Sequence, residues 1–191
     1  MCQRARRRPK AKLAVIDIKR AYFYAPSKRT TFIEIPSEDR QAGDEGKVGR
    51  LELSLYGTRD AAQNWSEEYT KTLRGWGFDV GKSSPYNFSH RERDIHMTVH
   101  GDDFAVTGTT SQLKWLKGKM SSEYYIKMDI LGPEKDQESE VKILSRIIRW
   151  TETGPEYEAD QRRRPVSQRD EVGRNKVHID TNSESWHREA R

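Results

Sequence analysis

The segment VHGDDFAVTG, residues 99–108, decides the fold of this chain. Apolar residues of the strand type stand on both sides of Gly101, which predicts two β-strands joined by a tight turn. Asp102 and Asp103 follow the glycine at the tip of that hairpin. Neighbouring carboxylates repel each other, and a buried ion without a partner costs on the order of several kcal/mol. The acidic pair therefore requires either water or a bound cation.

The remaining strands are predicted from apolar alternation and from the turn residues that bound it. They are LAVIDI (residues 13–18), TTFIEIP (30–36), GRLELSLYG (49–57), YYIKM (124–128) and VKILSRIIRW (141–150). In residues 49–57 the alternation predicts that Leu51, Leu53 and Leu55 face one way.

Two segments have the period of an α-helix. The first, residues 60–78, carries one apolar stripe that is expected to pack in the core and that ends near two glycines. The stripe consists of Ala61, Trp65, Tyr69, Leu73 and Trp76. The second, residues 110–124, turns Leu113, Leu116 and Met120 inward. Thr110 or Ser111 is expected to cap this second helix.

The order of these elements predicts an α+β fold, with a small, mainly antiparallel sheet and helices on one face. Only 33% of the 191 residues are hydrophobic, 34% are charged, and the mean hydropathy is −1.02. That composition predicts that part of the chain stays unpacked. The expected division is a basic disordered arm over residues 1–12, a folded domain over 13–160 and a disordered tail over 161–191.

The charge and the cysteine content restrict the partners. A net charge of +5 suits a polyanionic partner such as a nucleic acid. Cys2 is the only cysteine, so the sequence predicts neither a disulfide framework nor a cysteine metal site and favours a reducing compartment. No apolar window approaches the length needed to span a bilayer, so no membrane association is expected.

Asp17 lies within the predicted strand 13–18, where an acid also needs a partner. If Asp17, Asp102 and Asp103 converge at strand ends, they form an oxygen-rich site suited to Mg²⁺ or Mn²⁺. Two such ions can hold the attacking and leaving oxygens of a phosphoryl displacement. We expect Asp17 and Asp102 on adjacent strands with facing carboxylates. The residues alone also allow a solvated, inert hairpin turn.

Four motifs occur in a fixed order along the chain. They are DIKRAYFYA (residues 17–25), SLYG (54–57) followed eight residues later by Trp65, VHGDDFAVTG (99–108) and YYIKMDILG (124–132). This series resembles the reverse transcriptase of Ty1/copia-type retrotransposons over about residues 13–160. The resemblance implies a polymerase palm that carries out templated DNA synthesis. It also implies an RNA or DNA template with a primer, dNTPs and two Mg²⁺ or Mn²⁺ ions.

The resemblance also implies roles for single residues. Asp17 and Asp102 are expected to hold both metals, with Asp103 supporting them. Tyr22 falls where the family keeps an aromatic steric gate that excludes a ribose 2′-hydroxyl; without the family it reads as a core aromatic. Gly57 falls in the stretch that lies near the template and the incoming nucleotide.

Arg59 falls in the same stretch as Gly57. Lys127 is expected in a loop region behind the site. The sequence equally allows it to be an ordinary charge on a solvated face. The sequence departs from the family at His100–Gly101, which replaces Tyr-Val. His100 is expected either to approach the primer end or to fill the place of the tyrosine, and Gly101 makes the turn more permissive.

The resemblance implies fingers strands upstream of Asp17 and a thumb after the palm, and we expect this chain to hold neither in full. The sequence therefore predicts a palm fragment of a longer polyprotein, with incomplete fingers and thumb and a reading frame lost near Arg162. Two other classes of function remain open. One is a basic nucleic-acid-binding remnant without catalysis, and the other is a metal-dependent nuclease that uses the same acids.

Overall fold

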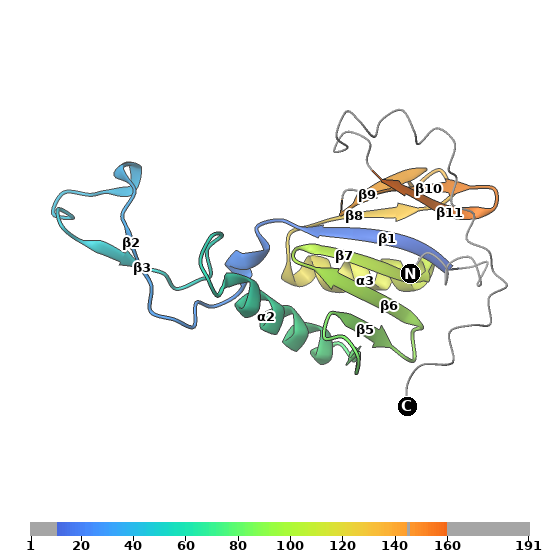
Figure 1. Cartoon of the computed structure of the whole chain (residues 1–191), viewed down its shortest axis with the longest axis horizontal. Helices are drawn as coiled ribbons and strands as arrows, with labels where there is room; N and C mark the ends of the chain where they lie inside the picture. Colours follow the sequence, from blue (N-terminus) through green and yellow to red (C-terminus); the bar gives the residue numbers. More distant parts are fainter. Residues whose placement is uncertain (1–10, 145, 160–191) are drawn as a thin grey trace. The chain divides into compact units, whose positions relative to one another are not determined.

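The computed structural model describes residues 11–144 and 146–159. The chain divides into two compact units, residues 1–158 and 159–191, and the second lies almost wholly outside the described residues. The predicted tail, and the predicted arm up to residue 10, also lie outside them. The described part is α+β with antiparallel sheets, as the order of sequence patterns predicted (Figure 1).

The predicted strands and helices follow one another in the expected order, but two short strands between the first α-helix and the acidic hairpin, Asp79–Val80 and Asn87–His90, were not predicted. The first half contains β1 (Ala11–Ile18), the 3₁₀-helix η1 (Ala21–Tyr24), β2 (Phe32–Glu34), the 3₁₀-helix η2 (Ser37–Asp39), β3 (Val48–Arg50), α2 (Ala61–Gly75), β4 (Asp79–Val80) and β5 (Asn87–His90). The second half contains β6 (Ile95–His100), β7 (Asp103–Thr109), α3 (Thr110–Glu123), β8 (Ile126–Leu131), β9 (Glu140–Ile143), β10 (Arg146–Thr151) and β11 (Gly154–Ala159).

The largest sheet has six strands in the order β4-β5-β6-β7-β1-β8. β1 lies between β7 and β8 and is antiparallel to both. Its sequence, AKLAVIDI, is almost continuously apolar because both of its faces are covered. Ala14, Ile16 and Ile18 belong to one hydrophobic core, whereas Leu13 and Val15 belong to another. The alternation of a strand thus divides the domain into two cores.

The larger core lies between one face of this sheet and the two helices. α2 contributes the predicted stripe, with Trp65 and Leu73 each 1% exposed, and α3 contributes Leu116 and its apolar neighbours. Figure 1 shows both helices beside the central strands. The cap of α3 is Thr109, whose extended backbone has ψ 157°, and not Thr110 or Ser111 as predicted. The helix begins one residue earlier because the chain leaves β7 directly into its first turn.

The smaller core lies on the opposite face of the sheet, against β9 and β10. It joins Leu13 and Leu131 to Val141 and Ile148 of the three-stranded sheet. The predicted single strand over residues 141–150 is therefore wrong. Ile143 pairs with Arg146, and Leu144 adopts a φ of +49°, so the segment folds back on itself as a hairpin.

β1 begins two residues before the predicted strand. Ala11 and Lys12, which were assigned to the basic arm, lie within it and are buried. The Lys12 ammonium lies 4.6 Å from the centroid of the Trp150 ring and 3.7 Å from a Glu134 carboxylate oxygen. An aromatic face and a carboxylate keep the charge satisfied while the aliphatic stem is buried.

The predicted strand over residues 49–57 is wrong beyond Arg50. Leu53 is 48% exposed and forms only an isolated bridge to Pro26, so the three alternating leucines do not share a buried face. The chain then turns at Gly57, whose φ is +87°. Among the described residues β3 pairs with β2 alone, and a two-stranded sheet offers little support for a longer strand.

No helix in the described ranges is both long and apolar enough to cross a membrane.

Replacing Leu73 with alanine tests the helix-side core. The side chain is 1% exposed within the larger core, so Leu73→Ala should lower the free energy of unfolding by ~2–5 kcal/mol. Urea denaturation of the whole chain measures the change. Lys71→Ala is the matched control on the exposed side of α2 and should shift stability by no more than ~0.5 kcal/mol. Equal losses in both variants would contradict this assignment of the core.

Candidate active site

The acidic hairpin closes with a two-residue turn. His100 at the end of β6 pairs with Asp103 at the start of β7, which leaves Gly101 and Asp102 as the loop. Gly101 has a φ of +64° and Asp102 does not have a positive φ, the combination found in type II′ turns. This geometry explains the glycine at the position where a side chain would be strained.

Asp17 lies directly opposite Asp103 in the antiparallel pairing of β1 with β7. Directly paired residues project from the same face of a sheet, with Cβ atoms about 4.5–5.5 Å apart. That face is opposite the helices, because the adjacent pair Ile16 and Phe104 belongs to the helix-side core. The two carboxylates therefore emerge on the same side at one end of the sheet.

Asp102 lies in the turn and not on a strand beside Asp17, which corrects the predicted arrangement. The two-residue turn uses Gly101 and Asp102, so Asp103 is the first residue available to pair with β1. Asp102 nevertheless stays next to the end of β1, because the backbone N–H of Ile18 donates to the Asp102 carbonyl at 3.2 Å.

The carboxylates influence one another electrically. Partial burial raises the pKa of Asp103 above its usual value, and the negative charges of Asp102 and Asp17 raise it further. His100, on the paired strand, opposes this effect. The three acids thus form one electrostatic group in which a cation would be stabilised.

Two lysines lie beside Asp17. The Lys19 ammonium lies 2.6 Å from a carboxylate oxygen of Asp17, and this contact raises the pKa of Lys19. Lys127 lies opposite Asp17 on β8 and pairs with Asp129 at 2.8 Å. The prediction that Lys127 lies in a loop is wrong, because the β-pairing continues through it.

The carboxylate oxygens of Asp17, Asp102 and Asp103 are chemically suited to a divalent cation, but they do not converge on one point. Within the described part of the chain, no group of three or more histidine, cysteine or acidic side chains could hold one ion. The Lys19 ammonium already forms an ion pair with Asp17. The pKa of Asp103 is raised by partial burial and by the neighbouring negative charges. Carboxylate oxygens that attract a positive charge are the ligands that Mg²⁺ and Mn²⁺ prefer.

Tyr22 lies in η1 with its ring against that of Tyr56. The ring centroids are 4.3 Å apart, and Phe23 meets the same Tyr56 ring edge-on at 5.8 Å. The pKa of Tyr56 is raised by burial and then by the negative charge of Asp102, which places this aromatic pair beside the acidic turn. Tyr22 is also half-buried against the helix-side core, which is the contact expected of a core aromatic.

Gly57 and Arg59 lie in the turn between Tyr56 and α2. A Cβ built on Gly57 meets no atom within 4 Å, so its φ of +87°, and not crowding, favours glycine. Thr58 closes the turn by donating from its hydroxyl to the Leu55 carbonyl at 2.7 Å. Arg59 is exposed.

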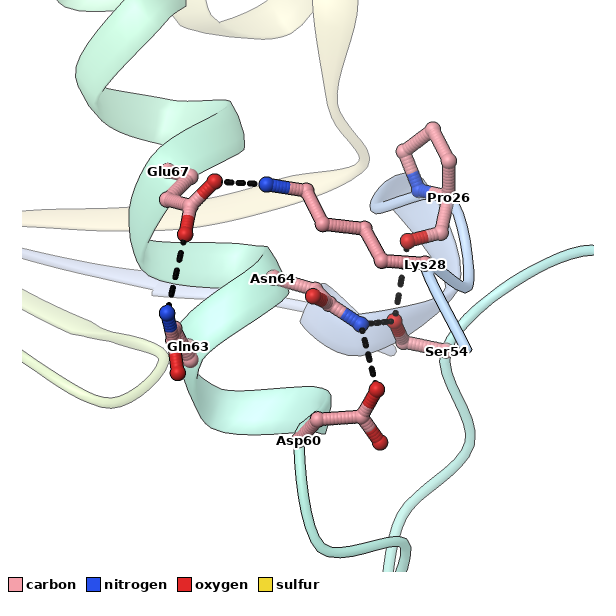
Figure 2. A network of polar contacts seen from close by, with 7 residues as sticks. All are labelled: Pro26, Lys28, Ser54, Asp60, Gln63, Asn64 and Glu67. Carbon is pink, nitrogen blue, oxygen red and sulfur yellow. Dashed lines mark hydrogen bonds and ion pairs between the residues drawn. The ribbon is translucent and has the colours of Figure 1, made fainter. Parts of the chain in front are cut away.

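A polar network joins α2 to two segments, the one after Tyr22 that contains Pro26 and Lys28 and the one before Tyr56 that contains Ser54 (Figure 2). The side-chain amide of Asn64 donates to the Ser54 hydroxyl at 3.0 Å, and that hydroxyl donates to the Pro26 carbonyl at 3.4 Å. Lys28 forms an ion pair with Glu67 one helical turn further along. The segments that follow Tyr22 and precede Tyr56 are thereby fixed to the same helix.

Three residues near the acids were missed by sequence reasoning as site residues. Lys19 stands two positions after Asp17, just beyond the end of β1, and its closeness to the acid along the chain could have been recognised. Tyr56 lies within the SLYG motif, but only its ring contact with Tyr22 shows that it belongs near the site. Trp65 was assigned to core packing alone, yet its indole N–H donates to the Gly101 carbonyl at 2.9 Å.

The structure is thus an α+β domain in which acids from a strand and from a neighbouring hairpin turn gather at one end of the sheet. Residues 9–142 match the protein family described as reverse transcriptase (RNA-dependent DNA polymerase). The chain belongs to this family, which confirms the resemblance seen in the four motifs.

Two relatives show the same relationship. The chain is 28% identical over 137 residues, 71% of its length, to the Transposon Ty1-MR1 Gag-Pol polyprotein of Saccharomyces cerevisiae. It is 25% identical over 122 residues, 62% of its length, to the Retrovirus-related Pol polyprotein from transposon TNT 1-94 of Nicotiana tabacum. The matched regions cover only 8% and 9% of these relatives, respectively.

Asp103→Asn should stabilise the chain at pH 7. The carboxyl binds its proton more tightly when folded, so stability falls as pH rises from the ordinary pKa of 3.8 through the raised folded pKa. Removing the charge should raise the free energy of unfolding by about 0.5 kcal/mol, the scale of one cross-strand pair. Urea denaturation at pH 7 and at pH 3 measures both ends of this window.

The gain should disappear at pH 3, where the wild-type carboxyl is protonated. Asp129→Asn is the control, because Asp129 has Lys127 as a partner at 2.8 Å and gains nothing from neutralisation. A stability difference at Asp103 that does not depend on pH would exclude charge as its cause.

Proposed function

We propose that this chain is the palm portion of a retrotransposon reverse transcriptase and that its acids serve two-metal nucleotidyl transfer. The observation that carries the proposal is the pairing of Asp17 with Asp103 beside the turn that holds Asp102. Membership of the reverse transcriptase family supports it, because the same acids stand in the motifs on which the family resemblance rests.

In this proposal Asp17 and Asp102 hold Mg²⁺ or Mn²⁺, and Asp103 supports them. The ions would bring the triphosphate and the primer 3′-hydroxyl together and offset the charge that develops on the oxygens. The primer 3′-hydroxyl would lose its proton to water, and its oxygen would form a bond to the α-phosphorus of a dNTP while the bond from that phosphorus to the bridging oxygen breaks and pyrophosphate leaves. The Asp17 carboxylate must first leave Lys19, since that lysine now occupies one of its oxygens.

The proposed substrates are an RNA or DNA template, a primer and dNTPs. Tyr22 would lie under the sugar of the incoming nucleotide, with its ring supported by Tyr56. Gly57 and Arg59 would lie near the template and nucleotide, where the exposed guanidinium can meet phosphate. His100, exposed at the end of β6, would approach the primer end.

A second candidate function is nucleic-acid binding without catalysis. Two observations favour it: Asp17 is already paired with Lys19, and no described group of acids encloses one ion. The net charge of +5 would still attract phosphate. Binding of a duplex that weakens with salt and is unaffected by Asp102→Asn, with no Mn²⁺ binding, would establish this second function.

Titration of the whole chain with Mn²⁺, followed by electron paramagnetic resonance, tests the metal site. Wild-type protein should bind Mn²⁺, and Asp102→Asn should weaken binding at least about tenfold, equal to about 1.4 kcal/mol. Asp129→Asn should leave the affinity unchanged, because its carboxylate serves Lys127. Lys19→Met should tighten binding by removing the competing ammonium.

Primer extension on the same protein separates the chemistries. A polymerase lengthens the primer only when dNTPs are present, whereas a nuclease shortens it without them. Equal Mn²⁺ affinity in wild type and Asp102→Asn would rule out the proposed site.

Tyr22→Ala tests the sugar gate in a chimaera where residues 13–142 replace the matching segment of the yeast relative. Ribonucleotide incorporation should rise relative to deoxynucleotide incorporation by about tenfold or more, because a steric clash is lost and no attraction is removed. Tyr22→Phe keeps the ring and should retain the wild-type preference. An unchanged preference in Tyr22→Ala would leave Tyr22 as a core aromatic only.

A further inference from the structure

The indole of Trp65 reaches from α2 to the acidic turn. Trp65 is 1% exposed, and its ring N–H donates to the carbonyl oxygen of Gly101 at 2.9 Å. That carbonyl belongs to the peptide that links Gly101 to Asp102. The bond therefore joins a buried helical side chain to the backbone immediately before the acids.

The indole ring is held in place by other aromatic rings. Tyr69, Tyr124 and Tyr24 surround it with centroid distances of 5.3, 5.4 and 6.4 Å. The Tyr124 hydroxyl donates to Thr72 on α2 at 3.0 Å. A ring fixed in this way presents its N–H in one direction, so it restrains the carbonyl that it meets.

A second hydrogen bond acts on the next peptide of the turn. The backbone N–H of Ile18 donates to the Asp102 carbonyl at 3.2 Å. Two consecutive carbonyls, of Gly101 and of Asp102, are thus held from α2 and from β1. Because peptide groups are planar, fixing both carbonyls limits the backbone dihedrals of Asp102 and hence the direction of its side chain.

We propose that Trp65 is a positioning residue for the acidic turn, whose hydrogen bond to Gly101 holds Asp102 and Asp103 ready to bind a divalent cation. The inference rests on the proposed function, since it assumes that these acids bind metal. The bond also satisfies the buried indole N–H, as any buried tryptophan requires, so the proposal concerns the second effect of that bond, which is to hold the turn. Groups that orient metal ligands in this way change metal affinity about 10- to 100-fold when removed.

The experiment uses the whole 191-residue chain and Mn²⁺ as the probe. Trp65→Phe keeps an aromatic ring but removes the N–H. It should weaken Mn²⁺ binding, measured by electron paramagnetic resonance, by about tenfold or more. Tyr69→Phe is the matched control. It keeps the ring that packs on the Trp65 indole, loses only the hydrogen bond that the Ser66 hydroxyl donates to the Tyr69 oxygen, and should leave the affinity unchanged.

A second variant keeps the volume of the indole. A benzothienylalanine placed at position 65 by stop-codon suppression replaces the ring N–H with sulfur and fills the same space. It should weaken Mn²⁺ binding as Trp65→Phe does, while circular dichroism shows an unchanged fold. Amide hydrogen exchange should accelerate at Asp102 and Asp103 in both variants and stay slow within α2.

The outcomes separate the two proposals. If wild type binds Mn²⁺ through Asp102 but both Trp65 variants keep the wild-type affinity, the positioning role is overturned and the proposed function stands. If the benzothienyl variant binds normally and only Trp65→Phe is impaired, ring volume is responsible and the hydrogen bond is not. If wild type shows no Asp102-dependent binding, the proposed function fails first.

Discussion

The register of β1 against β7 is the constraint on which the rest of the structure depends. With Ile16 opposite Phe104, both side chains enter the core beneath the helices, and Asp17 and Asp103 then emerge together on the other face. A slip of one residue would send Asp17 into that core and expose the isoleucine. Burial of apolar side chains and placement of the carboxylates are therefore fixed by the same pairing, and neither can change alone.

α2 connects this sheet to the segments around it. Its apolar stripe packs on the sheet, while its polar side reaches Ser54 through Asn64 and its indole reaches the turn at Gly101 through Trp65. Residues from three distant parts of the sequence, including the Tyr22–Tyr56 ring pair, thus take their positions from one helix. A helix packed by large aromatic side chains is a rigid support for such a site.

The repulsion among the acids opposes folding. Partial burial, and then repulsion by Asp102 and Asp17, raises the pKa of Asp103, and Lys19 is paired with Asp17. Buried charges are usually paired. Exceptions to this rule are expected where a protein binds a ligand. Under the proposed function, a bound cation would relieve this repulsion.

The sequence by itself determined the α+β class, both helices with their buried stripes, the acidic hairpin and the family, because these depend on local period and on motifs close in the chain. Only the tertiary structure decided that Asp17 pairs with Asp103 on one side and with Lys127 on the other. It alone assigned the Trp65 indole to Gly101. It also ended the strand at Arg50, where the alternating leucines had predicted continuation. Pairing register and hydrogen-bond partners join residues far apart in the chain, and alternation along one segment carries no information about which strand will lie beside it.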